Sequence, residues 1–382
     1  MKIMMIAAIM HSDSDGIFKK ICMQTSGLSS NNDKCDLLCL GDSGILVLTY
    51  INEKLISKKQ SFEYSAVDDG IGGIRHEKDL LNYASQFIAK NNCDMAYIRH
   101  MLPCPELIKL LKKFKRNKTK IGYEIPTYPY YNEQINVSHN KVKTFVKLVV
   151  ETAYWPQIYK LVDKLFVVKC NVKARHYKKM VSMYNGFSGE YKPLANRGCD
   201  DLNMIGVGTI YPYHGYELVI KNMQKCNSTL SNGNKVYFHI VGDSMEIRRL
   251  KHYVAENGLE KNVLFYGKKY GDELEEIYHK CNLGIGTMAL KLRHADVDTA
   301  IKNIEYFSVG LPVITNGNIF DISTEKGMYY KLMDADNINF NDIMKFVDTF
   351  FSTKNKEIDL KNLIKRFSWG SIMESVKRGL AN

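Results

Sequence analysis

The chain of 382 residues is long enough for two domains, each with its own core. Hydrophobic residues make up 45% and charged residues 25%, as in an ordinary soluble globular protein, and no apolar run approaches the length that spans a membrane. A net charge of +12 indicates polyanionic partners, which include phosphates, nucleic acid and acidic membrane surfaces, without choosing among them.

Cysteine usage and the N-terminus indicate the cellular compartment. The nine cysteines contain no C-x-x-C pair and no zinc spacing, which favours a reduced cytoplasmic protein. The apolar residues 3–10 are too few for a signal peptide, are followed by no A-x-A site, and end at His11. We therefore expect them to form a buried first strand.

The first half of the chain alternates predicted strands and helices. Gly16 precedes the first helix, where the backbone either turns sharply or passes close to a ligand. The segment 45–51 is expected to form a hairpin with residues around Phe62. The predicted strands are 3–10, 36–40, 45–51, 95–98, 120–124 and 164–168, and the predicted helices are 17–28, 80–90, 105–120, 142–161 and 174–179.

The helical segment 105–120 is amphipathic and basic. An apolar stripe that contains Leu107, Leu111 and Phe114 is surrounded by lysines. The stripe predicts a surface helix that faces the core. The alternative is a patch that rests on an anionic bilayer, to which each basic residue contributes about 1 kcal/mol.

The run E-I-P-T-Y-P-Y begins at Glu124, at the end of a predicted strand. Its two prolines stiffen the backbone and present Thr127, Tyr128 and Tyr130 in a loop. Rigid polar and aromatic groups in such a place suit sugar recognition by hydrogen bonds and stacking. A purely structural packing loop is the alternative.

The second half restarts the strand–helix pattern. The strand 203–207, the loop 208–215 and the helix 216–224 place free backbone N–H groups at a helix start, where they can hold a diphosphate. Further expected strands are 236–241 and 263–266, and further expected helices are 247–257, 273–280, 341–351 and 360–380.

The stretch 283–317 carries the strongest functional signal. It reads as a strand, a loop, a helix and, after Gly310, a second strand, which is the βαβ pattern of a parallel sheet. The loop contains Lys291, Arg293, Asp296 and Asp298, and ligands of open α/β sheets bind at this edge. These charges favour a binding site over an ordinary loop.

Several runs resemble the retaining glycosyltransferases of family 4 (glycosyl transferases group 1). The most specific is I-K-x-x-E-Y-F-x-x-G-L-P-V-I from Ile301 to Ile314, and the runs G-V-G-T-I-Y-P-Y-H-G-Y-E-L from Gly206 and F-S-W from Phe367 are also similar. The resemblance implies an α/β GT-B fold, in which two Rossmann-like parallel-sheet domains face each other across a cleft. It places an acceptor-side domain at residues 1–195, a nucleotide-sugar domain at 196–364 and a helix at 365–382 that crosses back to the first domain.

The resemblance also implies roles for individual residues. In the family, the residue that matches Glu305 accepts hydrogen bonds from two ribose hydroxyls; the alternative is a surface Glu paired with Lys302. Thr127, Tyr128 and Tyr130 would lie on the acceptor side, and Glu124 and Asp298 are the candidate catalytic carboxylates. The candidate donor-binding residues are Gly16, Gly208, Thr209, His214, Gly215, Lys291, Arg293, Lys302 and Glu305.

The sequence departs from the family pattern in two places. Val297 stands where the family has a first Glu, which Asp296 or Asp298 could replace, although Asp298 is also a natural helix N-cap. Thr209 and His214 stand where the family often has Arg and Lys, so the cations could come from Lys291, Arg293 and Lys302. The run D-V-D is a weak metal signal, and we expect neither a metal nor another cofactor.

The predicted function is transfer of a sugar, of hexosyl type, with retention from a nucleotide-sugar donor to a saccharide or polyprenyl-linked acceptor. We expect a cytoplasmic enzyme of surface polysaccharide or glycolipid biosynthesis, either free or peripheral on the inner face of the plasma membrane. One alternative is a sugar-nucleotide epimerase or hydrolase of the same fold, for which no clear catalytic group is present. Another is a polyanion-binding protein. Two features argue against it: the basic residues are scattered along the sequence, and no nucleic-acid motif is found.

Overall fold

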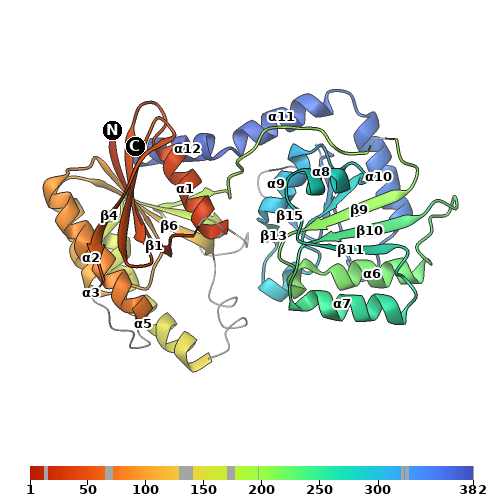
Figure 1. Ribbon diagram of the computed structural model, residues 1–382, viewed down its shortest axis with the longest axis horizontal. Helices are drawn as coiled ribbons and strands as arrows, with labels where there is room; N and C mark the ends of the chain where they lie inside the picture. Colours follow the sequence, from red (N-terminus) through yellow and green to blue (C-terminus); the bar gives the residue numbers. More distant parts are fainter. Residues whose placement is uncertain are drawn as a thin grey trace. The chain divides into compact units, whose positions relative to one another are not determined.

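The computed structural model describes residues 1–12, 16–64, 72–128, 141–169, 177–196, 198–319, 322 and 327–381, and these residues form two compact units (Figure 1). The N-terminal unit consists of the described residues within Met1–Lys169, Ala174–Tyr184 and Ser368–Asn382. The C-terminal unit is formed by Asn185–Phe367. The chain therefore changes unit before residue 195, where the sequence analysis places the boundary.

The N-terminal unit is built on a mixed sheet with the strand order β4-β3-β2-β1-β5-β6-β7-β8 among the described residues. The central strand β1 is parallel to both of its neighbours, and its residues 3–7 are buried, as predicted for a first core strand. The strands are β1 (Lys2–Met10), β2 (Lys34–Leu40), β3 (Gly44–Ile51), β4 (Lys54–Glu63), β5 (Met95–Arg99), β6 (Lys120–Tyr128), β7 (Lys164–Lys169) and β8 (Met180–Met183).

Two features of this sheet test the predictions directly. The hairpin is confirmed, because β3 and β4 are antiparallel and Ile45 lies opposite Phe62. The helix predicted at 174–179 is wrong in its described part, since residues 177–179 lead by a turn into β8. Residues 174–176 lie outside the described residues.

Helices cover both faces of this sheet (Figure 1). α1 (Gly16–Leu28) and α12 (Trp369–Ala381) pack on one face, and α2 (Gly72–Lys90), α3 (Pro105–Arg116) and α5 (Lys141–Leu161) pack on the other. The apolar stripe of α3, including Leu107, Leu111 and Phe114, is buried in the core that α2, α3 and α5 form with the sheet. α3 is therefore the core-facing helix that the sequence favours, and its apolar side is not available to a membrane.

The C-terminal unit contains a fully parallel sheet with the order β11-β10-β9-β12-β14-β16. Its strands are β9 (Leu202–Val207), β10 (Val236–Val241), β11 (Val263–Gly267), β12 (Leu283–Ile285), β14 (Val313–Thr315) and β16 (Tyr329–Lys331), and β13 (Val297–Asp298) pairs with β15 (Asn318–Ile319) beside it. Its helices are α6 (Tyr216–Lys225), α7 (Met245–Glu256), α8 (Asp272–Tyr278), α9 (Ile301–Ser308), α10 (Phe340–Ser352) and α11 (Lys356–Arg366), with short 3-10 turns η1 (Pro212–His214) and η2 (Leu290–Arg293). Apolar residues of α6, α7 and α10 share one core with the sheet.

The last helical region differs from the single helix predicted at 360–380. It consists of α11 and α12, which belong to different units and are separated at Phe367 and Ser368. α12 packs against α1, where a Cβ on Gly27 would come within 2.7 Å of the Trp369 carbonyl oxygen. Lys377 Nζ also lies 2.9 Å from an Asp33 carboxylate oxygen. The predicted return of the C-terminal helix to the first domain is confirmed.

Within the described ranges, none of the helices combines the length and the apolar character that crossing a bilayer requires.

Candidate functional site

The candidate site lies where the central strands of the C-terminal sheet end. β9, β12 and β14 are neighbouring parallel strands, so their carboxyl ends meet at one edge. Gly208 follows β9 with a φ of 122°, and Gly208 and Thr209 are both exposed. The next loop returns past β12, because Met288 N–H donates to His214 O at 3.0 Å. Gly215 is required there: its φ is 66°, and a Cβ would lie 2.8 Å from Met288 Cβ.

Asp298 joins the loops after β12 and β14. One carboxylate oxygen accepts from Thr287 N–H at 2.8 Å and from Thr315 Oγ1 at 2.8 Å. The other accepts from Thr287 Oγ1 at 3.0 Å and from Ala300 N–H at 3.1 Å. These four bonds use the acceptor capacity of the buried carboxylate. Asp298 is thus a positioning residue, and it is not the N-cap of α9, which is Ala300.

Lys302 lies buried in the first turn of α9. Its ammonium donates to Gly286 O at 3.0 Å and to Tyr216 Oη at 3.3 Å, and lies over the Tyr216 ring at 5.1 Å from the centroid. Burial lowers the pKa of Lys302 to about 8, although Asp298 and Glu305 favour the charged form. An ammonium has three N–H donors, so one remains beyond these two bonds.

His214 is held by the polypeptide in a defined tautomer. Nδ1 accepts from the Tyr211 backbone N–H at 3.2 Å, which places the ring proton on Nε2. Burial, with Lys302 and Arg293 nearby, lowers the pKa of His214 to about 2. The imidazole is therefore uncharged at neutral pH. It offers an N–H donor but cannot replace the positive charge of the family's lysine.

Arg293 supplies a second cation close to this histidine. Its guanidinium lies 4.7 Å from the centroid of the Tyr213 ring, and that ring packs edge-on against His214 with centroids 4.8 Å apart. The turn η2 brings Arg293 there from the loop after β12. Arg293 and Lys302 thus place two positive charges near His214.

Glu305 lies one helical turn after Lys302 on α9 and is partly buried. Burial raises the pKa of its carboxyl group, and Lys302 opposes this shift. Among the residues that the structure describes, no side chain or N–H group forms a hydrogen bond or ion pair with this carboxylate. In contrast to Asp298, Glu305 keeps its acceptor positions available for a ligand.

Sequence reasoning missed four polar residues of this region: Tyr216, Thr287, Asn303 and Thr315. Thr287 follows β12, Thr315 is the last residue of β14, and both hydroxyl groups donate to Asp298. Polar residues at the ends of apolar runs could have signalled this. Asn303 is fully buried, and neither of its amide atoms has a hydrogen-bond partner among the residues that the structure describes. A Cβ on Gly286 would lie 2.9 Å from Asn303 Oδ1, so this amide fills the space that the glycine leaves.

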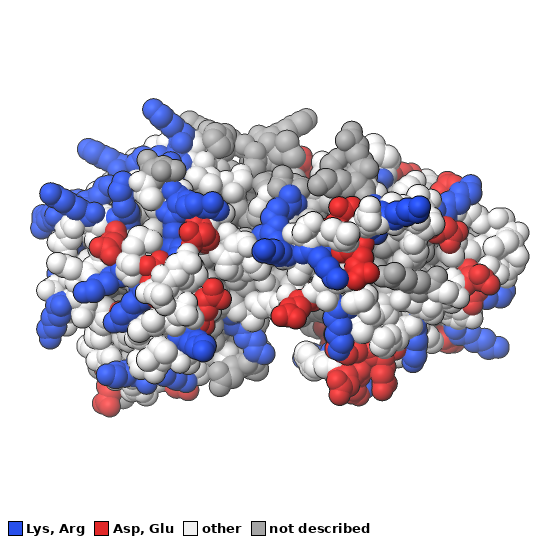
Figure 2. Space-filling view, turned by 90° about the horizontal axis from the view of Figure 1, so that it is seen from above, with Lys and Arg blue, Asp and Glu red and all other residues white. Residues whose placement is uncertain are grey.

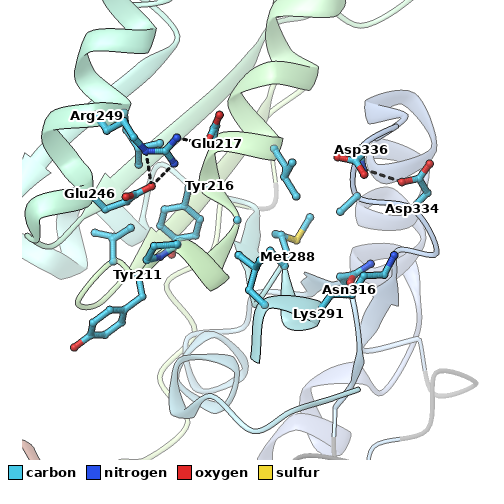
Figure 3. A pocket seen from close by; sticks show the side chains of 18 of the residues that line it. Tyr211, Tyr216, Glu217, Glu246, Arg249, Met288, Lys291, Asn316, Asp334 and Asp336 are labelled. Atoms are coloured by element: carbon cyan, nitrogen blue, oxygen red, sulfur yellow. Dashed lines mark hydrogen bonds and ion pairs between the residues drawn. The ribbon is translucent and has the colours of Figure 1, made fainter. Parts of the chain in front are cut away.

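A cavity of about 310 Å³ adjoins the loops of this site, and Figure 3 shows the side chains around it. Arg249 forms ion pairs with Glu217 and Glu246 on one wall. Lys291 lies on the opposite side with Asn316, so the structure places it at this cavity together with Gly215, whereas Lys302, Asp298 and His214 are not among the lining residues.

The predicted site residues of the N-terminal unit have different surroundings. Glu124 is fully buried and accepts from Gln24 Nε2 at 2.9 Å and from Arg99 Nη1 at 3.2 Å, with Lys20 Nζ at 3.7 Å. Because protein groups enclose the carboxylate, Glu124 cannot touch a substrate in this conformation. Its predicted catalytic contact is corrected to a structural ion cluster.

The expected stiff loop after Glu124 is also different, since β6 continues to Tyr128. Pro126 lies within this strand, where the pairing with β7 is irregular between Ile125 and Tyr128. Tyr128 is buried in the core, which removes its ring from sugar stacking, and Thr127 is partly exposed. Tyr130 lies outside the described residues.

Gly16 is the first residue of α1 and is exposed. A Cβ there would meet no atom within 4 Å. The space beside Gly16 is thus open on the protein side, and its approach to a ligand stays a prediction. Within the described ranges, no three His, Cys, Asp or Glu side chains converge as a metal-binding group.

With this geometry in place, sequence comparison identifies the class of domain. Residues 196–320 match the family Glycosyl transferases group 1, so the C-terminal unit carries a domain of that family. The match includes the loop after β9, the Asp298 cluster and all of α9. Among curated proteins, no sequence matches the chain.

Solved structures then define the fold of the whole chain as GT-B. Sucrose-phosphate synthase from Thermosynechococcus elongatus is similar with a TM-score of 0.63 and 13% identity, over 99% of this chain and 97% of that one. The lipopolysaccharide outer core galactosyltransferase WaaB, in its apo form, has a TM-score of 0.58 and 13% identity, over 100% of this chain and 99% of that one. TarM has a TM-score of 0.58 and 11% identity, over 100% of this chain and 99% of TarM. These similarities establish the α/β fold with its two Rossmann-like units.

Proposed function

We propose that the protein is a glycosyltransferase that binds a nucleotide-sugar donor at the carboxyl edge of the C-terminal sheet. The observation that carries the proposal is the pair formed by Lys302 and Glu305. A buried ammonium with one remaining donor lies one turn from a carboxylate that has no hydrogen-bond or ion-pair partner in the described part of the chain. Both lie inside a Glycosyl transferases group 1 domain. A nucleoside diphosphate presents both a polyanion and a ribose diol.

The donor diphosphate needs positive charge and N–H groups when the bond to the sugar breaks. Lys302 and Arg293 supply the charge, the Nε2–H of His214 supplies a neutral donor, and Gly208 and Thr209 supply exposed backbone at the end of β9. Glu305 accepts from the ribose hydroxyls, because a carboxylate offers only acceptors. Asp298 fixes the two loops that carry these groups, and Gly215 and Lys291 border the adjoining cavity.

The finer parts of the proposal are supported by the motif resemblance. They are a hexosyl donor, retention of configuration, and a saccharide or polyprenyl-linked acceptor in surface polysaccharide or glycolipid biosynthesis. In this mechanism the leaving phosphate removes the proton from the acceptor hydroxyl. Its bond to the sugar breaks as the acceptor oxygen bonds to the same carbon, and the proton ends on the diphosphate. No metal or cofactor is part of the proposal.

A thermal-shift experiment with UDP, GDP, CMP, dTDP and ADP tests the site. A ligand that binds only the folded state raises the melting temperature. We expect one of these nucleotides to stabilise the wild type but not Glu305→Ala.

The matched control is Glu273→Ala, an exposed glutamate on α8 of the same unit that pairs with Lys269. This variant should respond as the wild type does. Retention of the full shift in Glu305→Ala, or the lack of a shift with every nucleotide, would overturn the assignment.

A further inference from the structure

The first half of α5 exposes an apolar stripe. The exposed fractions of its side chains are 75% for Val142, 64% for Phe145, 56% for Val146 and 51% for Val149. The spacing of three and four residues places these four side chains on one side of the helix. Single exposed apolar residues are ordinary, but four in a continuous helical stripe indicate a surface that has a partner.

This stripe is not the side by which α5 joins its own unit. Leu148 and Glu151 are buried, and the helical spacing places them away from the stripe. Glu151 lies near His100 Nε2, at 3.5 Å, on the core side. α5 therefore has one apolar face packed in the unit and another that is exposed.

The charge of the chain is concentrated in the unit that carries α5. Residues 1–184 and 368–382 contain 30 of the 53 Lys and Arg and 18 of the 41 Asp and Glu, a net charge of +12. Residues 185–367 contain the other 23 of each, so this part is neutral. Figure 2 shows one face on which Lys and Arg predominate over the N-terminal unit, while both signs alternate over the other.

Basic side chains are exposed beside the stripe on α5 and also on α3, the helix that packs against α5. Lys141 and Lys143 are exposed within the same turns of α5. The neighbouring helix α3 exposes Lys109, Lys112 and Arg116, which share one side of that helix by their spacing of three and four residues. The surface combines an apolar helical stripe with flanking lysines, the pattern of a helix that lies in the plane of a bilayer interface.

We propose that α5 docks the N-terminal unit on an anionic lipid bilayer. Val142, Phe145, Val146 and Val149 enter the boundary between headgroups and acyl chains, and the lysines of α5 and α3 contact the acidic headgroups. A second copy of the chain fits this surface less well, because two surfaces from regions with a net charge of +12, residues 1–184 and 368–382 of each copy, would meet with like charges. This inference goes beyond the proposed sugar transfer, and it assigns to α5 the membrane role that the sequence offered to α3.

Vesicle co-sedimentation without nucleotide tests the inference independently of the donor site. The wild type should bind vesicles of phosphatidylcholine mixed with phosphatidylglycerol, more weakly as salt is added. The double variant Phe145→Ser/Val146→Ser should bind at least about tenfold more weakly, because two apolar side chains no longer leave water. Both positions are exposed, so the variant should keep the wild-type unfolding temperature.

The control is Ile358→Ser, which changes an apolar side chain of 57% exposure on α11 of the neutral unit and should bind as the wild type does. A direct measurement uses Phe145→Trp, whose emission should be quenched by brominated lipids. Wild-type protein that stays in the supernatant, a double variant that binds normally, or an unquenched Trp would overturn the proposal. So would a wild-type dimer in solution that this double variant converts to a monomer.

Discussion

Each unit buries a cluster of charged side chains, and the two clusters differ in what they leave open. In the N-terminal unit, the carboxylate of Glu124 is enclosed by Lys20, Arg99 and Gln24. In the C-terminal unit, the ammonium of Lys302 lies near two carboxylates, Asp298 and Glu305. Asp298 is saturated by four hydrogen bonds from its own loops, and Glu305 has no bonded partner among the described residues.

The difference separates a structural ion cluster from a binding site. Three protein groups hold Glu124. Burial lowers the pKa of Lys20, and the nearby Glu124 carboxylate opposes this shift, so the two charges stabilise each other. The second cluster keeps one N–H donor on Lys302 and one carboxylate on Glu305. Burial alone therefore does not identify a functional charge; the remaining hydrogen-bonding capacity does.

The largest expected effect is on the first cluster. Glu124→Ala leaves Lys20 and Arg99 buried without a counter-charge, and we expect the free energy of unfolding to fall by about 3 kcal/mol. Urea unfolding of the full chain measures this. Asp359→Ala, on the neutral unit's helix α11, is a control that should change stability little, since Asp359 is exposed.

A loss of less than about 1 kcal/mol in Glu124→Ala would show that the cluster is not a stabilising unit. The double variant Glu124→Leu/Arg99→Met sharpens the comparison, because it replaces most of the ion cluster by apolar groups. It should regain stability relative to Glu124→Ala.

An intermediate effect is expected from pH on the second cluster. Since the pKa of Lys302 is lowered to about 8, raising the pH through 8 removes its charge and should weaken binding of the stabilising nucleotide. The decrease should approach about tenfold per pH unit above this value, in proportion to the protonated fraction. Titrations from neutral to alkaline pH check this, with Lys302→Met as a control that should lack this decrease.

The stability of the unliganded protein should change in the opposite direction. Between pH 8 and 10.5 the unfolded chain holds the Lys302 proton and the folded chain does not. This group's contribution to the free energy of unfolding therefore rises with pH in that window. A difference between wild type and Lys302→Met that does not depend on pH would contradict the assigned pKa.

The smallest effect is expected at Asn303. Its buried amide has no hydrogen-bond partner within the described ranges, so Asn303→Leu, which is similar in shape and apolar, should raise the free energy of unfolding by about 1 kcal/mol. Thermal and urea unfolding measure the change. Asn222→Leu is the matched contrast, since the Asn222 amide donates to Leu218 O and Ala335 O and its loss should destabilise. A destabilised Asn303→Leu would show that the amide is satisfied.

Much of the fold could be predicted because hydrophobic runs and glycines mark its strands and turns. The hairpin of β3 with β4, the βαβ pattern of β12, α9 and β14, and the returning C-terminal helix all follow from local pattern. The break between α11 and α12 could not be predicted from periodicity, since helical spacing continues across Phe367. The short strand β8 depends on its neighbour β7 and has little signal of its own.

The sequence predicts a region for the site but not the roles of its individual residues. The charges from Lys291 to Glu305 predicted a binding site in this region. The hydrogen bonds of the structure then distinguish Asp298, which has four, from Glu305, which has none to its carboxylate among the described residues. The sequence does not show that His214 Nδ1 accepts a hydrogen bond from the Tyr211 backbone, or that protein side chains enclose the Glu124 carboxylate. The exposed stripe of α5 was missed because that helix is apolar on both sides, which by sequence indicates a buried helix.

The central claim is that Lys302 and Glu305 recognise different parts of one nucleoside diphosphate. Calorimetric titration of the stabilising diphosphate and of its nucleoside into the wild type, Lys302→Met and Glu305→Ala tests it most directly. We predict that Lys302→Met weakens binding of the diphosphate by at least about tenfold and leaves binding of the nucleoside unchanged. Glu305→Ala should weaken binding of both ligands. Equal losses for the two ligands in Lys302→Met, or unchanged binding in Glu305→Ala, would contradict the account.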